Sequence, residues 1–155
     1  MARAPFQILV LPFRRGPAGA RFAVFRRADG DATMWQGLAG GGEDDETPEA
    51  AARREMGEEA GIDASATLIP LPTVSRIPTD GWKGRQPWAD ELETIPEHAF
   101  GVEVGVDFEV QLSHEHLEFR WLDAADACAL LTWEGNRLAL GALQAMLKGE
   151  RPART

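Results

Sequence analysis

Three glutamates lie close together in one short stretch of this sequence. Glu55, Glu58 and Glu59 have the spacing of neighbours on one face of an α-helix. Carboxylates this close repel one another, and each raises the pKa of the others unless a cation lies among them. A hard divalent cation such as Mg²⁺ prefers oxygen ligands and usually keeps waters and substrate phosphates as well. The spacing therefore favours a phosphate-directed metal site, although an isolated E-x-x-E-E helix is more often a solvated acidic face.

The residues around these glutamates predict the helix that must carry them. Thr47 is a good N-cap, Pro48 suits the first helical position, and Gly61 is a natural terminator. The sequence between them, PEAAARREMGEEA, is rich in helix formers. An apolar stripe that includes Met56 runs beside the glutamates and should pack on a core. We therefore expect a helix from 48 to 60 with one acidic face and one buried face.

A longer pattern encloses this helix. It reads G-x5-E-x7-R-E-U-x-E-E-x-G-U, where U is a bulky apolar residue, and every specified position is filled. The residues that fill it are Gly40, Glu46, Arg54, Glu55, Met56, Glu58, Glu59, Gly61 and Ile62. The pattern resembles the signature of the Nudix hydrolases. The resemblance implies the Nudix fold, an α/β (α+β) architecture in which a mixed β-sheet lies in an α/β/α sandwich.

The resemblance also implies an activity, the Mg²⁺-dependent hydrolysis of a diphosphate linkage, with Mn²⁺ as an alternative metal. The three clustered glutamates would be metal ligands, and Glu55 and Glu58 are also our candidates for a catalytic role. The backbone carbonyl of Ala39 would supply a further ligand. We expect Glu46 and Arg54 to tie the preceding loop to the helix.

Two segments outside the signature are similar to the bacterial dihydroneopterin triphosphate pyrophosphatases, also known as dATP pyrophosphohydrolases. They are FRRADGDATMWQG before it and SHEHLEFRWLDAADACALLTWEGNR after it. This similarity implies a triphosphate substrate cleaved to a monophosphate and pyrophosphate, with dihydroneopterin triphosphate preferred and dATP accepted. The alternatives are a hydrolase of ADP-ribose or a nucleotide sugar, and a nucleotide-sensing module that does not cleave its ligand.

Several residues in these flanking segments are candidates for the site. Glu115 is proposed as a further metal ligand or the general base, against the alternative of an ordinary loop carboxylate. Arg26 is the candidate for a bidentate grip on the distal phosphates, against an exposed charge at a strand end. Trp35 is expected to form a flat wall for the substrate ring.

Two backbone segments complete the expected site. We expect the glycine run 40–42, with Gly40 and Gly41, to let the backbone approach the substrate. The loop 78–93 is long enough to be functional. Its Trp82 and Trp88 either form a lid over the ring or anchor the loop to the body of the protein.

His114 and His116 flank Glu115 but make a weak zinc site, because no cysteine or third histidine accompanies them. The single Cys128 excludes an internal disulfide, fits a reducing compartment, and suits a small buried position in a helix.

Composition indicates one domain over residues 1–155, with hydrophobic and charged contents of 44% and 26%. The net charge of −9 argues against a nucleic-acid partner. A small-molecule triphosphate remains possible as the substrate, because cations bound at the site can offset the charge of its phosphates. No apolar run approaches the roughly 18 residues of a membrane span, and the N-terminus lacks a signal peptide. We therefore expect a cytoplasmic protein with no membrane partner. The sequence leaves its oligomeric state open, and a homodimer is compatible with it.

The hydrophobic pattern predicts the remaining elements. Strands are expected at 6–14, 21–26, 67–77, 98–106 and 118–122, with a short extended segment at 35–38. Helices are expected at 123–131 and 134–147, the second with Leu138, Leu140, Leu143 and Met146 on its apolar side. A loop is expected at 29–31 and a frayed tail from 149.

Overall fold

A computed structural model describes residues 2–28 and 33–149 of the chain. The strands are β1 (Arg3–Gly16), β2 (Gly19–Arg27), β3 (Trp35–Gln36), β4 (Leu38–Glu43), β5 (Leu68–Pro78), β6 (Thr94–Glu103) and β7 (His116–Leu122). The helices are α1 (Pro48–Ala60), α2 (Ala124–Leu130) and α3 (Glu134–Gly149). Two short 3₁₀ turns, η1 (Asp80–Trp82) and η2 (Pro87–Asp90), lie between β5 and β6. The expected loop at 29–31 and the tail beyond 149 fall outside the described residues.

Strand β1 is the centre of a mixed sheet of seven strands. It pairs antiparallel with β2 and β4 and parallel with β6, while β5 pairs antiparallel with β6. Strand β2 also pairs antiparallel with β3 and β7. The sheet therefore joins segments from both ends of the chain.

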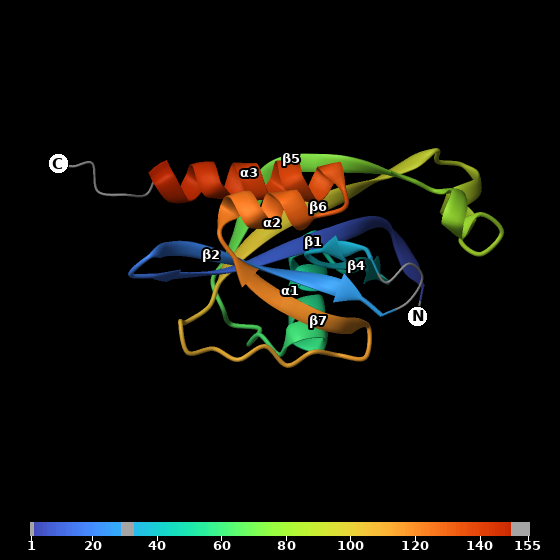
Figure 1. Cartoon of the computed structure of the whole chain (residues 1–155). Coiled ribbons are helices and arrows are strands. Elements are labelled where there is room, and N and C mark those ends of the chain that lie inside the picture. Colours follow the sequence, from blue (N-terminus) through green and yellow to red (C-terminus); the bar gives the residue numbers. More distant parts are fainter. Residues whose placement is uncertain (1, 29–32, 150–155) are drawn as a thin grey trace.

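Helices cover both faces of this sheet. Alternate residues of β1 point to opposite faces, so Ile8 and Val10 pack towards α1, and Leu9, Leu11 and Phe13 pack towards α2 and α3. Figure 1 shows α1 on one side of the sheet and the two C-terminal helices on the other. The expected α/β/α sandwich with a mixed sheet is confirmed.

Helix α1 has the bounds and the caps expected from its sequence. The hydroxyl of Thr47 accepts a hydrogen bond from the backbone N–H of Ala50 at 3.1 Å. Gly61 ends the helix with φ 73°, a left-handed conformation that favours glycine. Met56 is fully buried, so the apolar stripe packs on the sheet as predicted.

The strands and the last helix differ in detail from expectation. Strand β6 covers 94–103 rather than 98–106, because its N-terminal half pairs with the end of β5 through Ile95 and Ile77. On α3 the expected apolar side is partly wrong, since Leu138 is 55% exposed and Met146 is 36% exposed. Leu138 lies two residues, or about 200°, from the buried Leu140 and so points away from the core.

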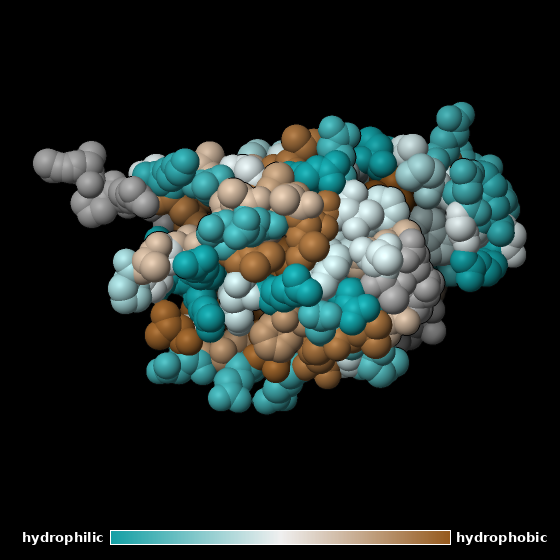
Figure 2. Space-filling model, viewed as in Figure 1, coloured by the Kyte–Doolittle hydropathy of each residue, from teal (hydrophilic) through white to brown (hydrophobic). Residues whose placement is uncertain are grey.

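The segment 78–93 is anchored to the body of the protein. The rings of Trp82 and Trp88 pack with centroids 5.7 Å apart, and the Trp88 indole N–H donates to the backbone carbonyl of Arg3 at 2.9 Å. This end of the β5–β6 ribbon is mostly hydrophilic on the face drawn in Figure 2, whereas hydrophobic residues gather over α2 and β7. These contacts support the hypothesis that Trp82 and Trp88 anchor the loop to the body of the protein. Within the described ranges, no helix is long and apolar enough to cross a membrane.

Candidate functional site

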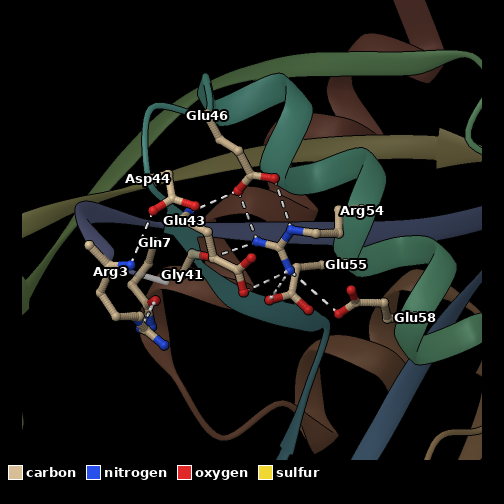
Figure 3. Close-up of polar contacts among 10 residues, drawn as sticks. Arg3, Gln7, Gly41, Glu43, Asp44, Glu46, Arg54, Glu55 and Glu58 are labelled. Atoms are coloured by element: carbon tan, nitrogen blue, oxygen red, sulfur yellow. Dashed lines mark hydrogen bonds and ion pairs between the residues drawn. The ribbon is translucent and has the colours of Figure 1, made fainter.

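Arg54 of α1 joins the helix to the loop before it (Figure 3). Its guanidinium donates to both carboxylate oxygens of Glu46, at 2.9 and 3.0 Å, and to the backbone carbonyl of Gly41 at 3.0 Å. The hydrogen bond with Arg54 is the main reason that the pKa of Glu46 is lowered. The same guanidinium lies 3.5 Å from Glu55 and 3.4 Å from Glu58. The expected tie is present, and it also holds a cation beside the acidic face of the helix.

A single cavity of about 350 Å³ is lined by five glutamates and by Ala39. The glutamates are Glu43, Glu55, Glu58, Glu59 and Glu115. The structure therefore brings together every metal ligand proposed from the sequence. Among the described residues, no group of three or more His, Cys, Asp or Glu side chains is arranged to hold a metal ion as it stands.

The two inner glutamates are in an unfavourable electrostatic environment. Glu59 is 1% exposed, and its pKa is raised by burial, by a side-chain hydrogen bond with Glu55, and by the charges of Glu55 and Glu115. Burial also raises the pKa of Glu55, and the nearby charges of Glu58 and Glu115 add to it. One carboxylate oxygen of Glu59, Oε2, is buried and has no hydrogen-bond partner among the described residues. Such a group is costly unless a cation or a proton accompanies it.

Long-range backbone contacts bring Glu115 to this cavity. The segment 104–115 crosses the C-terminal end of α1, where the backbone N–H of Gln111 donates to the carbonyl of Ala60 at 3.0 Å. Ser113 donates in the same way to the carbonyl of Glu59 at 3.4 Å. The buried His116 follows, with Nε2 3.7 Å from the carboxylate of Glu59. These contacts place Glu115 in the lining of the cavity that the helix glutamates also line.

The glycine run is part of strand β4, and protein side chains fill the space beside it. A Cβ on Gly40 would overlap the carboxylate of Glu55, and a Cβ on Gly41 would overlap the guanidinium of Arg3. Both glycines line the cavity, as expected for residues near a substrate. However, their missing side chains make room for Glu55 and Arg3.

Of the two adjacent arginines at the end of β2, Arg27 lines the cavity, whereas the sequence analysis singled out Arg26. The guanidinium of Arg26 binds Glu118 of the paired strand β7, at 2.8 and 2.9 Å. Neighbouring residues of a strand point to opposite faces, so Arg27 lines the cavity while Arg26 lies along the sheet.

Trp35 is also placed differently from expectation. Its side chain is 6% exposed and packs in the core between the sheet and α2–α3, and the guanidinium of Arg120 lies 4.8 Å from the ring centroid. The ring is therefore covered by protein on both sides and cannot stack on a substrate. The sequence analysis assigned Trp35 to a stacking surface for the substrate ring because it lies close to the glycine run, but this side chain is part of the core.

A second cavity of about 650 Å³ adjoins the first. The two share Gln7, Arg27, Gln36 and Ala39 in their linings. The second cavity extends between the end of β5, strand β6 and the start of α3. A ligand that occupied both cavities would pass over the shared residues.

Three large apolar side chains stand at the second cavity with much of their surface exposed. They are Val74, Trp133 and Leu138, with exposed fractions of 51%, 46% and 55%. Exposed apolar side chains that gather at one cavity indicate a binding surface. The sequence analysis missed Trp133. Its position directly before a helix, outside the apolar stripe of that helix, was a signal that its ring is exposed.

Comparison with known proteins identifies relatives over most of the chain. The NUDIX domain model matches residues 6–141. An RNA pyrophosphohydrolase of Roseobacter denitrificans is 31% identical over 137 residues, which covers 81% of this chain and 82% of that protein. A dihydroneopterin triphosphate diphosphatase of Escherichia coli K12 is 30% identical over 140 residues, covering 89% and 91%. The crystal structure of a NUDIX hydrolase from Listeria monocytogenes superposes with a TM-score of 0.82 at 36% identity, covering 94% of this chain and 96% of that one.

Proposed function

The chain belongs to the Nudix family, and from this premise we propose that it is a Mg²⁺-dependent pyrophosphohydrolase of a nucleoside or dihydroneopterin triphosphate. The family and the named relatives make it a hydrolase of phosphoanhydride bonds. The observation that carries the finer proposal is the pair of joined cavities, one acidic and one partly apolar. The products would be a monophosphate and pyrophosphate.

The acidic cavity fits a divalent cation. Glu55 and Glu59 have raised pKa values, and the unpartnered Oε2 of Glu59 is an oxygen donor of the kind that Mg²⁺ or Mn²⁺ prefers. Glu58, Glu115 and the carbonyl of Ala39 would complete the set of oxygen donors. When bound, the cation would neutralise phosphate charge and lower the pKa of a coordinated water.

The protein's own groups would position the reacting parts. Glu115 lines the same cavity as the helix glutamates and is exposed, so it can accept a proton from the attacking water or complete the cation's ligands. Arg27 lines both cavities and would hold the phosphates that lie between them. Arg54, fixed by Glu46, would keep Glu55 and Glu58 in place.

The second cavity would hold the ring of the substrate. Its exposed Trp133 offers a flat apolar surface, and stacking discriminates poorly between similar bicyclic rings. The E. coli relative is named for dihydroneopterin triphosphate, so we propose that ring as preferred, with dATP accepted. The role that the sequence analysis assigned to Trp35 thus passes to Trp133.

The Roseobacter relative suggests a competing substrate, the triphosphate at the 5′ end of an RNA. The net charge of −9 argues against it, because a protein that holds an RNA backbone needs a basic surface. A small-molecule triphosphate requires cations only where its phosphates lie. The further alternatives are ADP-ribose or a nucleotide sugar, and ligand sensing without cleavage.

A substrate panel tests the proposal. Purified protein with Mg²⁺ or Mn²⁺ is assayed for pyrophosphate and phosphate release from dihydroneopterin triphosphate, dATP, ADP-ribose, a nucleotide sugar and a 5′-triphosphate RNA. The proposal expects pyrophosphate from the first two and the highest kcat/KM for the pterin. The proposal would be overturned if another compound of the panel had a kcat/KM more than about a hundredfold above the values for dihydroneopterin triphosphate and dATP. Tight binding without turnover of any compound would indicate a sensing module.

A further inference from the structure

The second cavity contains a buried carboxylate that the proposed reaction does not use. Glu97 of β6 is 8% exposed and lines this cavity. Within the described ranges, its carboxylate makes no hydrogen bond or ion pair with the protein. A buried carboxylate without a partner costs stability, so its presence calls for a ligand that pairs with it.

The fold holds Glu97 open to the cavity. On β6 the neighbours two residues away, Ile95 and Ala99, are on the same face, and α3 covers that face further along the strand. The first turn of α3 passes beside Glu97: a Cβ added to Gly135 would overlap the side chain of Ser75, the β5 residue paired with Glu97, and lie 3.8 Å from a Glu97 oxygen. Glu97 and the start of α3 thus line the same cavity, into which a ligand could enter.

The charged groups around this carboxylate leave it available for a ligand. Arg27, Arg76 and Glu134 line the same cavity, and Arg76 donates instead to the hydroxyl of Thr94. Burial raises the pKa of Glu97 to about 7. At pH 8 the group is therefore mainly ionised and offers only acceptor oxygens.

Guanine and pterin rings share an edge that matches such an acceptor. Each has a ring N–H beside an exocyclic amino group, so two donors point the same way and fit the two oxygens of a carboxylate. Adenine presents an amino group beside a ring nitrogen that accepts, and an ionised carboxylate repels that nitrogen. We propose that Glu97 is a specificity-determining residue that accepts two hydrogen bonds from a guanine or pterin ring, one from the 2-amino group and one from the adjacent ring N–H. This inference rests on the proposed function, because the phosphates must lie in the acidic cavity for the ring to reach Glu97.

The substitution Glu97→Gln tests this inference directly. An amide offers one acceptor and one donor, which matches the edge of adenine and mismatches that of guanine. Steady-state kinetics at pH 8 with saturating Mg²⁺ would compare dGTP, dITP and dATP, where dITP lacks the exocyclic amino group. We expect the wild type to prefer dGTP, then dITP, then dATP. In the variant the dGTP/dATP ratio of kcat/KM should fall at least about tenfold, with dihydroneopterin triphosphate following dGTP.

A matched control is Glu103→Gln, the same change on the same strand, at a partly exposed residue that pairs with Arg15 outside both cavities. It should leave the three kcat/KM values in their wild-type ratios. If wild type hydrolyses the three triphosphates and Glu97→Gln changes all of them by one common factor, the specificity role of Glu97 is overturned while the proposed function stands. If wild type hydrolyses no triphosphate, the proposed function itself fails and this inference fails with it.

Discussion

The carboxylate of Glu55 occupies the space where a side chain on Gly40 would begin. The two residues come from α1 and β4, so this contact joins the helix that carries the glutamates to the strand that carries the carbonyl of Ala39. Any Cβ at position 40 would push Glu55 out of the acidic cavity. Gly40 and Glu55, two positions of the signature, thus form one structural unit.

Removing charge from the acidic face should abolish activity without unfolding the protein. Glu58→Gln and Glu59→Gln each keep the side-chain shape, so we expect a folded protein with kcat lower by several orders of magnitude and weaker Mg²⁺ binding. Thermal stability without metal should rise modestly for Glu59→Gln, because the burial cost and the repulsion at this site are relieved. The measurements are steady-state kinetics and thermal unfolding.

The matched control for this series is Glu49→Gln, on the same helix but paired with Arg53. It should retain wild-type activity. A kcat for either test variant within about tenfold of wild type, some 1.4 kcal/mol, would exclude the metal-ligand assignment.

Glu115→Gln should lower kcat much more than it raises KM. Its contribution as base or outer ligand appears mainly in the transition state, while substrate binding rests on other groups. Kinetics at saturating Mg²⁺ measure the two parameters separately. An unchanged kcat would assign the base to another residue.

Substitutions of the two adjacent arginines of β2 should have unequal effects. Arg27→Gln should lower kcat/KM for a triphosphate at least about tenfold, because its guanidinium lines both cavities. Arg26→Gln removes a partly exposed ion pair with Glu118, which is typically worth about 0–1 kcal/mol, so its effect should stay within about threefold. Equal effects of the two changes would contradict the strand orientation described above.

Substitution of Trp133 should affect ligand binding, whereas substitution of Trp35 should affect the stability of the fold. Trp133→Ala should weaken binding of ring-bearing triphosphates by about 1–3 kcal/mol, with little change in thermal stability, because its side chain is 46% exposed. Trp35→Ala should destabilise the protein by about 3–5 kcal/mol, because it removes a ring from the core. Denaturant unfolding and KM values for dATP and dihydroneopterin triphosphate test both. A stable Trp35 variant with a raised KM would restore the original assignment of the stacking wall.

Glu97 should make stability depend on pH. Burial raises its pKa to about 7, above the ordinary 4.5, so the folded state binds more protons than the unfolded state between these values. The free energy of unfolding should therefore fall as pH rises through this window, by at most about 3 kcal/mol. Glu97→Gln removes the ionisation, so it should raise stability at pH 8 and change it little at pH 4.

Thermal and denaturant unfolding of wild type and Glu97→Gln at the two pH values measure this effect. Glu103→Gln, at a partly exposed position of the same strand, should not raise stability at pH 8. An equal stability change for Glu97→Gln at both pH values would show that its carboxylate is not desolvated.

The sequence by itself determined α1 and its acidic face. The caps at Thr47 and Gly61, the apolar stripe and the glutamate spacing all act within one helix, where side chains three and four residues apart are neighbours whatever surrounds them. The pairing of Glu46 with Arg54 was also predictable, because the loop that carries Glu46 leads directly into the helix and only seven residues lie between the two. Most strands and both C-terminal helices also followed from the hydrophobic pattern, and the resemblance implied their arrangement as a mixed sheet between helices.

Only the tertiary structure decided which other residues reach the site. Arg26 and Arg27 are adjacent in sequence, and a strand sends neighbours to opposite faces, so pairing with β7 settled which one lines the cavity. Packing against α2 and α3 buries Trp35 in the core, whereas Trp133 remains exposed at the second cavity. Glu115 and Glu97 reach the two cavities because chain segments distant in sequence meet there, at the end of α1 and at the start of α3. Such contacts depend on the pairing of whole elements, which local residue patterns do not contain.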